Sequence, residues 1–411
     1  MAPDCAGGER RTALILTSQF ADPITKRVIT GGSVRIVRDL AGVLSQLGYE
    51  VRIIQKGSCD EDATIAPGFN VRFVRAPFRT WSDLLFACKT RSSVRQADLC
   101  CYATPELGFP FYSSRGFAVQ HGISWDNPQC GAGRAFLLRS LQKLRNLWMC
   151  NSLRLIMCVD TNYINYLRAF GGAAASRCQR CVYIPNYADL AKMPTVTDED
   201  LSRRFRKKTL LFLRRFEKHR GPDLFVSVCQ QLRTDGITFR AKMIGDGSQR
   251  EHIRDMIEAH GLGGLVEISQ CGFDEVYAFV GEASISVIPS VWSEGTSLAA
   301  VESIALGVPV VATDVGGLGN LIVPEYNGFL ARPNAIELAR HVAKLLTDER
   351  TYLRMARRCL DMRDALSYER WRTAVVEALE GCGLIGPQFR AEALAVVSGD
   401  GDCSRSRCVP A

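Results

Sequence analysis

The sequence predicts an α/β protein made of two doubly wound domains. The chain has 411 residues, of which 47% are hydrophobic and 23% charged, so each of about two domains can bury its own core. Short, continuously apolar segments alternate with stretches of helical periodicity along most of the chain. Apolar strands that alternate with helices indicate parallel sheets covered on both faces.

The N-terminal half begins with a βαβ pattern. An apolar run at Thr12–Leu16 is followed by a loop that contains Gly31-Gly32, and a second run occupies Val51–Ile54. Between the two runs, apolar side chains recur at helical spacing, at Ile36, Leu40, Leu44 and Leu47. The change from strand-like to helical period and back is typical of a βαβ unit.

The C-terminal half repeats this alternation more regularly from Thr209 onward. Strand candidates at Leu210–Leu213, Phe239–Ile244, Val266–Ser269 and Ile285–Pro289 are each followed by a predicted helix, at Pro222–Leu232, Gln249–Ala259, Asp274–Gly281 and Ser297–Leu306, and Val308–Ala312 follows as a further strand. We expect a first domain over residues 1–188, a polar linker over 189–208 and a second domain over 209–397. The last helices are expected to pack back on the first domain, and residues 398–411 to form a disordered tail.

Composition and charge narrow the location and the partners. Apolar runs are far shorter than the ~18–20 residues that cross a bilayer, and no signal-peptide pattern opens the chain. We therefore expect a cytoplasmic protein, with the inner face of the cell membrane left open. Residues 1–190 hold 23 Lys and Arg against 14 Asp and Glu, and the remainder 28 against 29. A basic N-terminal half permits an anionic partner, and a solvated basic surface is the alternative.

The 16 cysteines are scattered through apolar segments. We expect most of them to be buried thiols, and the lone Cys178-x-x-Cys181 lacks the second pair that a zinc site usually needs. No metal site is predicted, although metal or redox use stays open at this pair. The sequence also lacks a complete G-x-G-x-x-G, a P-loop and a G-x-S-x-G elbow, and nucleic-acid binding has only the basic half in its favour.

The segment Ser290–Gly317 carries the strongest chemical signal. After a predicted strand, a loop with Glu294 and Gly295 leads into a helix that begins at Thr296 or Ser297. The start of a helix offers unpaired N–H groups and a partial positive charge to an anionic or hydroxyl-rich ligand. Glu302, inside that helix, could accept hydrogen bonds from a sugar diol, or could simply be a residue of the helix surface.

These residues resemble the donor-binding motif of retaining glycosyltransferases of family 4. Glu294 and Glu302 match the E-x7-E pattern. The segment that follows, G-V-P-V-V-A-T-D-V-G-G, resembles the sequence that these enzymes carry after the pattern. Residues 184–189, I-P-N-Y-A-D, are similar to the I-P-N-G-V-D that closes the family's N-terminal domain, with Tyr187 in place of Gly. Residues 214–221, R-R-F-E-K-H-R-G, resemble G-R-x-x-x-x-K-G, with Arg214 in place of Gly and Arg220 in place of Lys.

The resemblance implies the GT-B fold, in which two Rossmann-like domains face each other across a cleft. It also implies roles for individual residues. Arg215 and Arg220 would hold the donor diphosphate without a metal, Glu294 would orient the hexose, and Glu302 would bind the ribose. Further donor-binding positions are Gly31, Gly32, Gly245, Gly295, Thr296 and Ser297, and His121 would lie beside the transferred sugar. Without the family, the arginines would be read as surface charge and His121 as a structural residue.

The function that the resemblance implies is retaining transfer of a hexosyl unit from a nucleotide diphosphate sugar, with no cofactor. The acceptor would be a saccharide or a lipid-linked molecule in cell-envelope polysaccharide or glycolipid synthesis. A nucleotide-sugar epimerase or hydrolase and a non-catalytic nucleotide-sugar-binding protein are the alternatives. The basic amphipathic stretch Arg134–Met157 could lie on an anionic membrane, or could pack on the core of the first domain.

Overall fold

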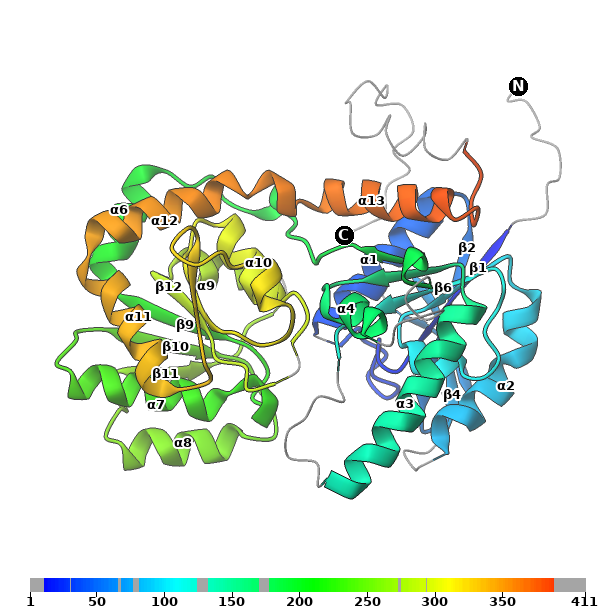
Figure 1. The fold of residues 1–411 in the computed structure, drawn as a ribbon, viewed down its shortest axis with the longest axis horizontal. Coiled ribbons are helices and arrows are strands. Elements are labelled where there is room, and N and C mark those ends of the chain that lie inside the picture. Colours follow the sequence, from blue (N-terminus) through cyan, green and yellow to red (C-terminus); the bar gives the residue numbers. More distant parts are fainter. Residues whose placement is uncertain are drawn as a thin grey trace.

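A computed structural model describes residues 11–29, 31–65, 68–76, 81–123, 132–169, 177–272, 275–292 and 294–387, with the backbone alone for residues 132–139 and 177–178. The described residues form two α/β domains, each built on its own sheet (Figure 1). The residues expected to form a C-terminal tail lie outside the described ranges.

The N-terminal domain contains an eight-stranded sheet in the order β3-β4-β2-β1-β5-β6-β7-β8. All neighbours are parallel except the edge pair β3 and β4. The strands are β1 (Thr12–Thr17), β2 (Glu50–Gly57), β3 (Glu61–Ile65), β4 (Phe69–Arg75), β5 (Leu99–Tyr102), β6 (Gly116–Gln120), β7 (Leu155–Cys158) and β8 (Cys181–Tyr183). The helices of this domain are α1 (Gly32–Gln46), α2 (Ser82–Gln96), α3 (Ala132–Ser152) and α4 (Asn162–Arg168), with short 3-10 turns at η1 (Pro105–Gly108) and η2 (Arg177–Arg180).

The C-terminal domain has a six-stranded, all-parallel sheet in the order β11-β10-β9-β12-β13-β14. Its strands are β9 (Thr209–Leu213), β10 (Arg240–Ile244), β11 (Val266–Ser269), β12 (Ile285–Ile288), β13 (Val310–Thr313) and β14 (Gly328–Ala331). Its helices are α7 (Pro222–Thr234), α8 (Arg250–Ala259), α9 (Val276–Gly281), α10 (Leu298–Ala305), α11 (Ala335–Thr347) and α12 (Glu349–Asp361), and its 3-10 turns are η4 (Lys218–Arg220), η6 (Gly316–Asn320) and η7 (Asp364–Leu366).

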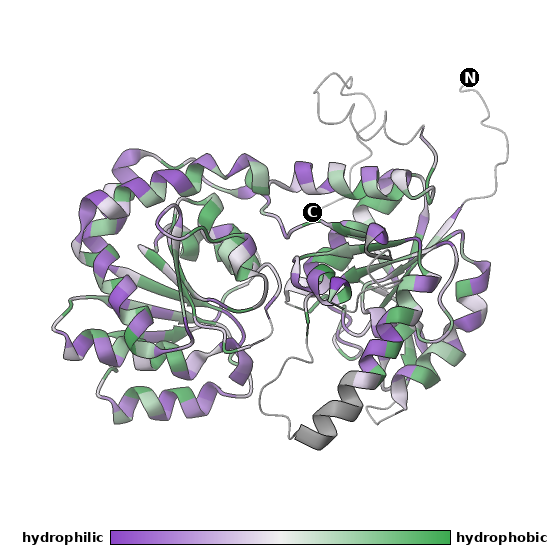
Figure 2. Cartoon of the chain, viewed as in Figure 1, coloured by the Kyte–Doolittle hydropathy of each residue, from purple (hydrophilic) through white to green (hydrophobic). Residues whose placement is uncertain are grey.

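Both sheets are buried on their two faces, as continuously apolar strands require. In β1, Ala13 and Ile15 belong to one buried cluster, while Leu14 and Leu16 belong to the cluster on the opposite face. In β9, Leu210 and Leu211 divide in the same way between two clusters. Figure 2 shows the hydrophobic residues concentrated in the strands and the hydrophilic ones on the outer faces of the helices.

Residues 189–208, predicted as a linker, hold η3 (Leu190–Lys192) and α6 (Asp198–Lys207). Thr197 and Asp200 form a capping box at the start of α6, which satisfies two N–H groups of the first turn. The buried Arg204 of α6 donates to the Leu306 carbonyl at 2.6 Å. The second half of this segment is therefore part of the C-terminal domain.

The chain crosses between the domains twice, and the two crossings are hydrogen-bonded to each other. The Ala188 N–H donates to the Leu366 carbonyl at 2.7 Å, and the Tyr368 N–H donates to the Ala188 carbonyl at 2.9 Å. After the second crossing, α13 (Tyr368–Gly381) buries Trp371 and Val375 in the core of the N-terminal domain (Figure 1). The last helix thus fastens the two domains together.

No helix within the described ranges is long and apolar enough to cross a membrane.

Candidate active site between the two domains

The loops at the carboxyl ends of the two sheets meet between the domains. The Thr296 hydroxyl, before α10, donates to the Val159 carbonyl after β7 at 2.7 Å. Asn320 of η6 accepts a hydrogen bond from the Thr161 N–H at 3.0 Å. The crevice outside the carboxyl ends of parallel strands is where ligands bind in open α/β sheets, so this junction is the candidate active site.

Glu294 is the centre of a buried ionic cluster. Its Oε2 atom accepts from Arg214 Nη2 at 2.5 Å, from Arg220 Nη1 at 2.5 Å and from the Ser290 hydroxyl at 2.6 Å. Burial alone would raise the pKa of Glu294, but the two guanidinium groups and Ser290 outweigh it and lower the pKa to about 2. Glu294 is therefore ionised at neutral pH and opposes two positive charges.

Arg215, which was expected to hold the diphosphate, is not part of this cluster. Its side chain is 65% exposed and lies 3.5 Å from Glu217. Arg214, which replaces the glycine of the resembled motif, is instead 5% exposed and contacts Glu294. Successive side chains of an extended segment point to opposite faces. At the end of β9, that alternation turns Arg214 inward and Arg215 outward.

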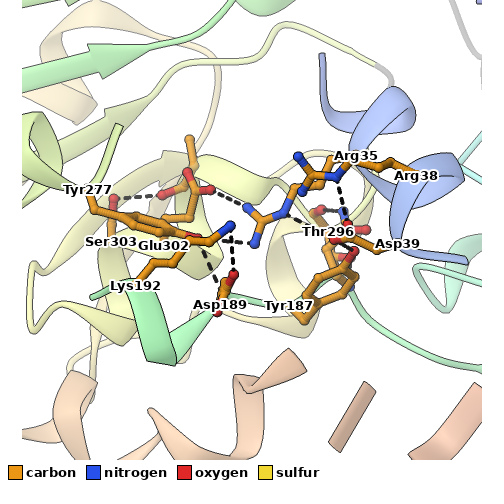
Figure 3. Close-up of polar contacts among 12 residues, drawn as sticks. Arg35, Arg38, Asp39, Tyr187, Asp189, Lys192, Tyr277, Thr296, Glu302 and Ser303 are labelled. Carbon is orange, nitrogen blue, oxygen red and sulfur yellow. Dashed lines mark hydrogen bonds and ion pairs between the residues drawn. The ribbon is translucent and has the colours of Figure 1, made fainter. Parts of the chain in front are cut away.

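Glu302 forms a second buried ion pair, and its partner comes from the other domain. Arg35 Nη1, on α1, donates to Glu302 Oε1 at 2.7 Å, and Arg35 Nη2 lies 3.1 Å from the Tyr277 hydroxyl (Figure 3). Burial raises the pKa of Glu302 to about 7, and the positive charge of Arg35 opposes that rise. The side chains of both Arg35 and Glu302 are 8% exposed. The sequence analysis expected Glu302 in the site but missed Arg35.

The same network reaches the crossing between the domains. Asp39, one turn after Arg35, accepts from the Tyr187 hydroxyl at 2.5 Å. The Arg35 guanidinium lies over the Tyr187 ring, 5.1 Å from its centroid, and that ring lies 4.3 Å from the Trp371 ring of α13. Tyr187 stands where the resembled motif has glycine, and here its ring connects both crossings to α1.

Two of the expected glycines lie where the two domains contact each other. A Cβ atom on Gly295 would lie 2.9 Å from the His121 carbonyl oxygen, and one on Gly32, the first residue of α1, would lie 2.9 Å from the Leu298 side chain. Gly31 precedes α1 as its N-cap residue. A side chain at Gly295 would push the domains apart because it would meet backbone, whereas the flexible Leu298 side chain could move aside for one at Gly32.

Ser297, Thr296 and Gly245 are three further positions expected to bind the donor. Ser297 is the buried N-cap residue of α10, and Thr296 contacts the N-terminal domain through Val159 and Asn186. Gly245 follows β10 and lies against the backbone of Arg214 rather than facing the other domain. Gly245 thus packs against the backbone of Arg214, a residue of the ionic cluster.

His121 lies at the end of β6 and is neutral. Burial lowers its pKa to about 4, although a hydrogen bond with Ala103 opposes this. Nε2 lies 3.2 Å from the Ala103 carbonyl oxygen. A carbonyl oxygen can only accept, so Nε2 carries the proton and Nδ1 is left as an acceptor.

A cavity of about 320 Å³ opens between the domains beside Glu294. It is lined by Ile123, Asn162, Tyr166, Glu294 and Gly316. This volume is at the small end of ligand pockets, which suits a single sugar ring. Asn162 and Tyr166 of α4 carried no sequence signal. A larger hollow, of about 550 Å³, lies over β1 to β4 of the first sheet, with Thr12 and Asp62 in its lining, away from this junction.

No group of three or more His, Cys, Asp or Glu side chains that could hold a metal converges within the described part of the chain. The side chain of Cys178, in the single C-x-x-C, lies outside it.

Residues 197–360 match the family described as Glycosyl transferases group 1. An uncharacterized glycosyltransferase of Methanocaldococcus jannaschii, MJ1178, is 34% identical over 140 residues, which are 34% of this chain and 38% of that protein. The putative colanic acid biosynthesis glycosyltransferase WcaL of Escherichia coli K12 is 32% identical over 152 residues, 34% of this chain and 37% of WcaL. The chain thus covers less than two fifths of the length of these relatives.

The likeness to solved structures extends over nearly the whole chain. Sucrose-phosphate synthase from Thermosynechococcus elongatus aligns with a TM-score of 0.74 at 19% identity, covering 90% of this chain and 99% of that one. Anabaena Alr3699/HepE in complex with UDP aligns with a TM-score of 0.68 at 15% identity, covering 90% and 100%. These likenesses confirm the predicted GT-B architecture of two Rossmann-like domains. Residues 197–360 therefore carry a domain of the glycosyl transferases group 1 family, within a chain that has the GT-B fold.

Proposed function

We propose that this protein is a glycosyltransferase that moves a hexosyl unit from a nucleotide diphosphate sugar to a saccharide or lipid-linked acceptor, with retention of anomeric configuration. The observation that carries the proposal is the pair of buried carboxylates, Glu294 and Glu302. Glu294 borders the cavity between the domains, and Glu302, in α10, contacts Arg35 of the N-terminal domain. Each is held by guanidinium groups. The resemblance to retaining family 4 enzymes supports retention.

In this proposal the donor lies on the C-terminal domain. Glu302 accepts hydrogen bonds from the ribose hydroxyls, and the diphosphate lies near Arg220, which is 31% exposed and reaches Glu294. Arg214 and the N–H groups at the start of α10 add positive potential behind it. Arg215 is exposed in the present arrangement, and its part in binding the diphosphate stays a prediction.

Transfer breaks the bond between the anomeric carbon and the diphosphate oxygen and forms one to an acceptor hydroxyl, whose proton is released. The departing diphosphate gains negative charge, which preorganised cations stabilise. The cavity beside Glu294 accommodates the sugar ring, with His121 and the Gly31-Gly32 loop closing the site from the other domain. We propose that these charges suffice without a metal.

UDP-sugars are the first donors to test, because the complexes of Anabaena Alr3699/HepE contain UDP and UDP-glucose. A thermal-shift panel of UDP-, GDP- and ADP-sugars would select the donor, and mass spectrometry with a cell-derived acceptor pool would detect a glycosylated product. NMR of that product would give its anomeric configuration, and EDTA should leave the rate unchanged. A free sugar or an epimer without product would favour the epimerase or hydrolase. Binding without turnover would favour a non-catalytic binding protein.

We propose that the acceptor belongs to cell-envelope polysaccharide or glycolipid synthesis, because the relative WcaL is named as a putative colanic acid biosynthesis glycosyltransferase. A lipid-linked acceptor would place the enzyme at the cytoplasmic face of the membrane. Arg145 of α3 lies 3.7 Å from Asp83 of α2, and the two helices run side by side (Figure 1). Large exposed hydrophobic side chains gather on these two helices and just before α2, namely Trp81, Leu85, Leu141, Leu144 and Trp148. We name these five residues the α2–α3 patch.

The two helices of the α2–α3 patch also carry basic residues. Lys89 and Arg91 lie on α2, and Lys143 and Arg145 lie on α3. Exposed tryptophan and leucine beside Lys and Arg suit the interface of an anionic bilayer, where the apolar groups insert and the cations meet the headgroups. We therefore propose peripheral contact with an anionic membrane through this patch.

A further inference from the structure

The two carboxylate oxygens of Glu302 are in different situations. Oε1 accepts from Arg35 Nη1 at 2.7 Å. Oε2 has no hydrogen-bond partner among the described residues. One oxygen is thus fixed by the N-terminal domain, and the other is available to a ligand.

Arg35 is itself held in place from three sides. Its Nη2 lies 3.1 Å from the Tyr277 hydroxyl of α9, its Nε lies 3.8 Å from Asp39 of α1, and its guanidinium lies over the ring of Tyr187 (Figure 3). These contacts come from both domains and from the crossing between them. The guanidinium is therefore preorganised toward Glu302 only while the domains are closed.

We propose that Arg35 is a positioning residue that completes the donor site from the opposite domain, by holding the Glu302 carboxylate charged and oriented for the ribose hydroxyls. This inference rests on the proposed function, in which Glu302 binds the ribose. It means that a nucleotide binds more tightly to the closed than to the open arrangement. Nucleotide binding and domain closure then favour each other.

The electrostatics of the site make this role necessary. Burial raises the pKa of Glu302, and Arg35 opposes that rise. The other titratable groups near Glu302 are Tyr277 and Cys271, neither of which supplies a positive charge. Asp39 and Tyr187 lie beyond Arg35, and Lys192 pairs with Asp189. Without Arg35, the pKa of Glu302 would rise further, which favours the neutral carboxyl group.

Titration of the full chain with UDP, by calorimetry at pH 7 and at pH 9, tests the role of Arg35. For wild type and Arg35→Lys, the affinity for UDP should differ by no more than about twofold between the two pH values, since a pKa of about 7 leaves Glu302 half ionised at pH 7. Arg35→Gln should bind about tenfold more weakly at pH 7, the size of one charged hydrogen bond, and the loss should be smaller at pH 9, because the higher pH favours the ionised carboxylate. The phosphate of UDP is deprotonated across this range, since its pKa is about 6.

Two controls separate positioning from a general loss of structure. Arg52→Ala removes the same charge from β2, where the side chain is 59% exposed and pairs with Glu50, and it should bind UDP as wild type does. 2′-Deoxy-UDP lacks one hydroxyl that Glu302 would hold, so the penalty of Arg35→Gln should be smaller with it. Circular dichroism checks that each variant is folded.

Other outcomes of the UDP titration would contradict the proposed role of Arg35. If Arg35→Gln binds UDP like wild type, Arg35 does not position Glu302. If it is weakened equally at pH 7 and pH 9, Arg35 does not hold Glu302 charged. The proposal requires both effects, so either result overturns it. If folded wild type fails to bind UDP and the other nucleotide diphosphates at any pH, the proposed function itself falls, and this inference falls with it.

Discussion

Arg214 and Glu294 form a buried ion pair of 2.5 Å at the carboxyl end of the second sheet, where the sequence motif would place a glycine. A third group, Arg220, reaches the same Oε2 atom from the turn before α7. Two guanidinium groups around one carboxylate leave a net positive charge at the proposed diphosphate position.

Alanine substitution should separate the two neighbouring arginines. We expect Arg214→Ala to lower kcat/KM about 10- to 100-fold, because it removes a charged hydrogen bond worth about 1.5–3 kcal/mol. Arg215→Ala should change kcat/KM less than about twofold, since an exposed ion pair contributes little. Steady-state release of nucleotide diphosphate measures both, with thermal unfolding as the check on folding. A larger loss in Arg215→Ala would restore the assignment made from the sequence motif.

The fold was largely predictable because apolar runs identify buried strands directly. The run at Thr12–Leu16 is β1, and the run at Leu210–Leu213 lies in β9. The antiparallel pair β3 and β4 was not predicted from the sequence. Its edge strand β3 reads E-D-A-T-I and exposes its charged end to solvent, so it lacks the continuous apolar signal of a central strand.

The site was predictable in part. Glu294 and Glu302 are part of a local sequence pattern, whereas Arg35 meets Glu302 across 267 positions of the chain. No local pattern encodes a contact that depends on how two domains face each other. Which of Arg214 and Arg215 turns toward Glu294 depends on the face that each residue takes at the end of β9, and the motif alone does not give that face.

Glu302→Ala should lower kcat/KM by a factor that corresponds to a loss of about 2–4 kcal/mol of transition-state stabilisation, because the charged hydrogen bonds to the ribose are lost. This substitution also leaves the buried Arg35 without its carboxylate, so Glu302→Gln serves as a second variant of nearly equal size. Glu282→Ala is the matched control, because Glu282 is an exposed glutamate of the same domain that pairs with Lys207. Unchanged kinetics in both Glu302 variants, with the donor varied through its KM, would contradict the ribose contact.

Glu294 should stabilise the fold in a manner that depends on pH. Its pKa is about 2 in the folded protein, below the ordinary value of 4.5, so its contribution is present above pH 4.5 and is lost as the pH falls toward 2. We expect Glu294→Gln to lower the free energy of unfolding by about 3 kcal/mol at pH 7, because the buried Arg214 and the half-buried Arg220 lose their counter-ion. Urea denaturation between pH 7 and pH 3 should show the difference from wild type shrinking below about pH 5.

Glu325→Gln gives the control for that series. Glu325 is 71% exposed and lies 3.6 Å from Lys344, so its loss should be small at each pH. If the difference in unfolding free energy between wild type and Glu294→Gln stays constant from pH 7 to pH 3, the two arginines do not lower the pKa of Glu294.

His121 should not titrate in the working range of the enzyme. Burial lowers its pKa to about 4, so the imidazole stays neutral from about pH 5.5 upward. The pH profile of kcat/KM should therefore lack a limb near 6.5 that belongs to a histidine. His121→Asn should lower the rate by the same factor at pH 6 and at pH 8. A factor that changes across this interval would show that the histidine takes up a proton there.

The α2–α3 patch predicts binding to anionic vesicles. Leu144 is 65% exposed and Trp148 is 51% exposed, and the two lie four residues apart on α3, so both can enter the headgroup region together. Vesicles containing phosphatidylserine should carry wild type upward in a flotation gradient at low salt, and neutral phosphatidylcholine vesicles should carry much less. Leu144→Glu should abolish flotation, since it places a negative charge at an anionic surface. Ile336→Glu, at a residue of α11 that is 64% exposed, should float as wild type does. If wild type stays at the bottom with anionic vesicles, the patch does not bind lipid, while transfer to a soluble saccharide acceptor would be unaffected.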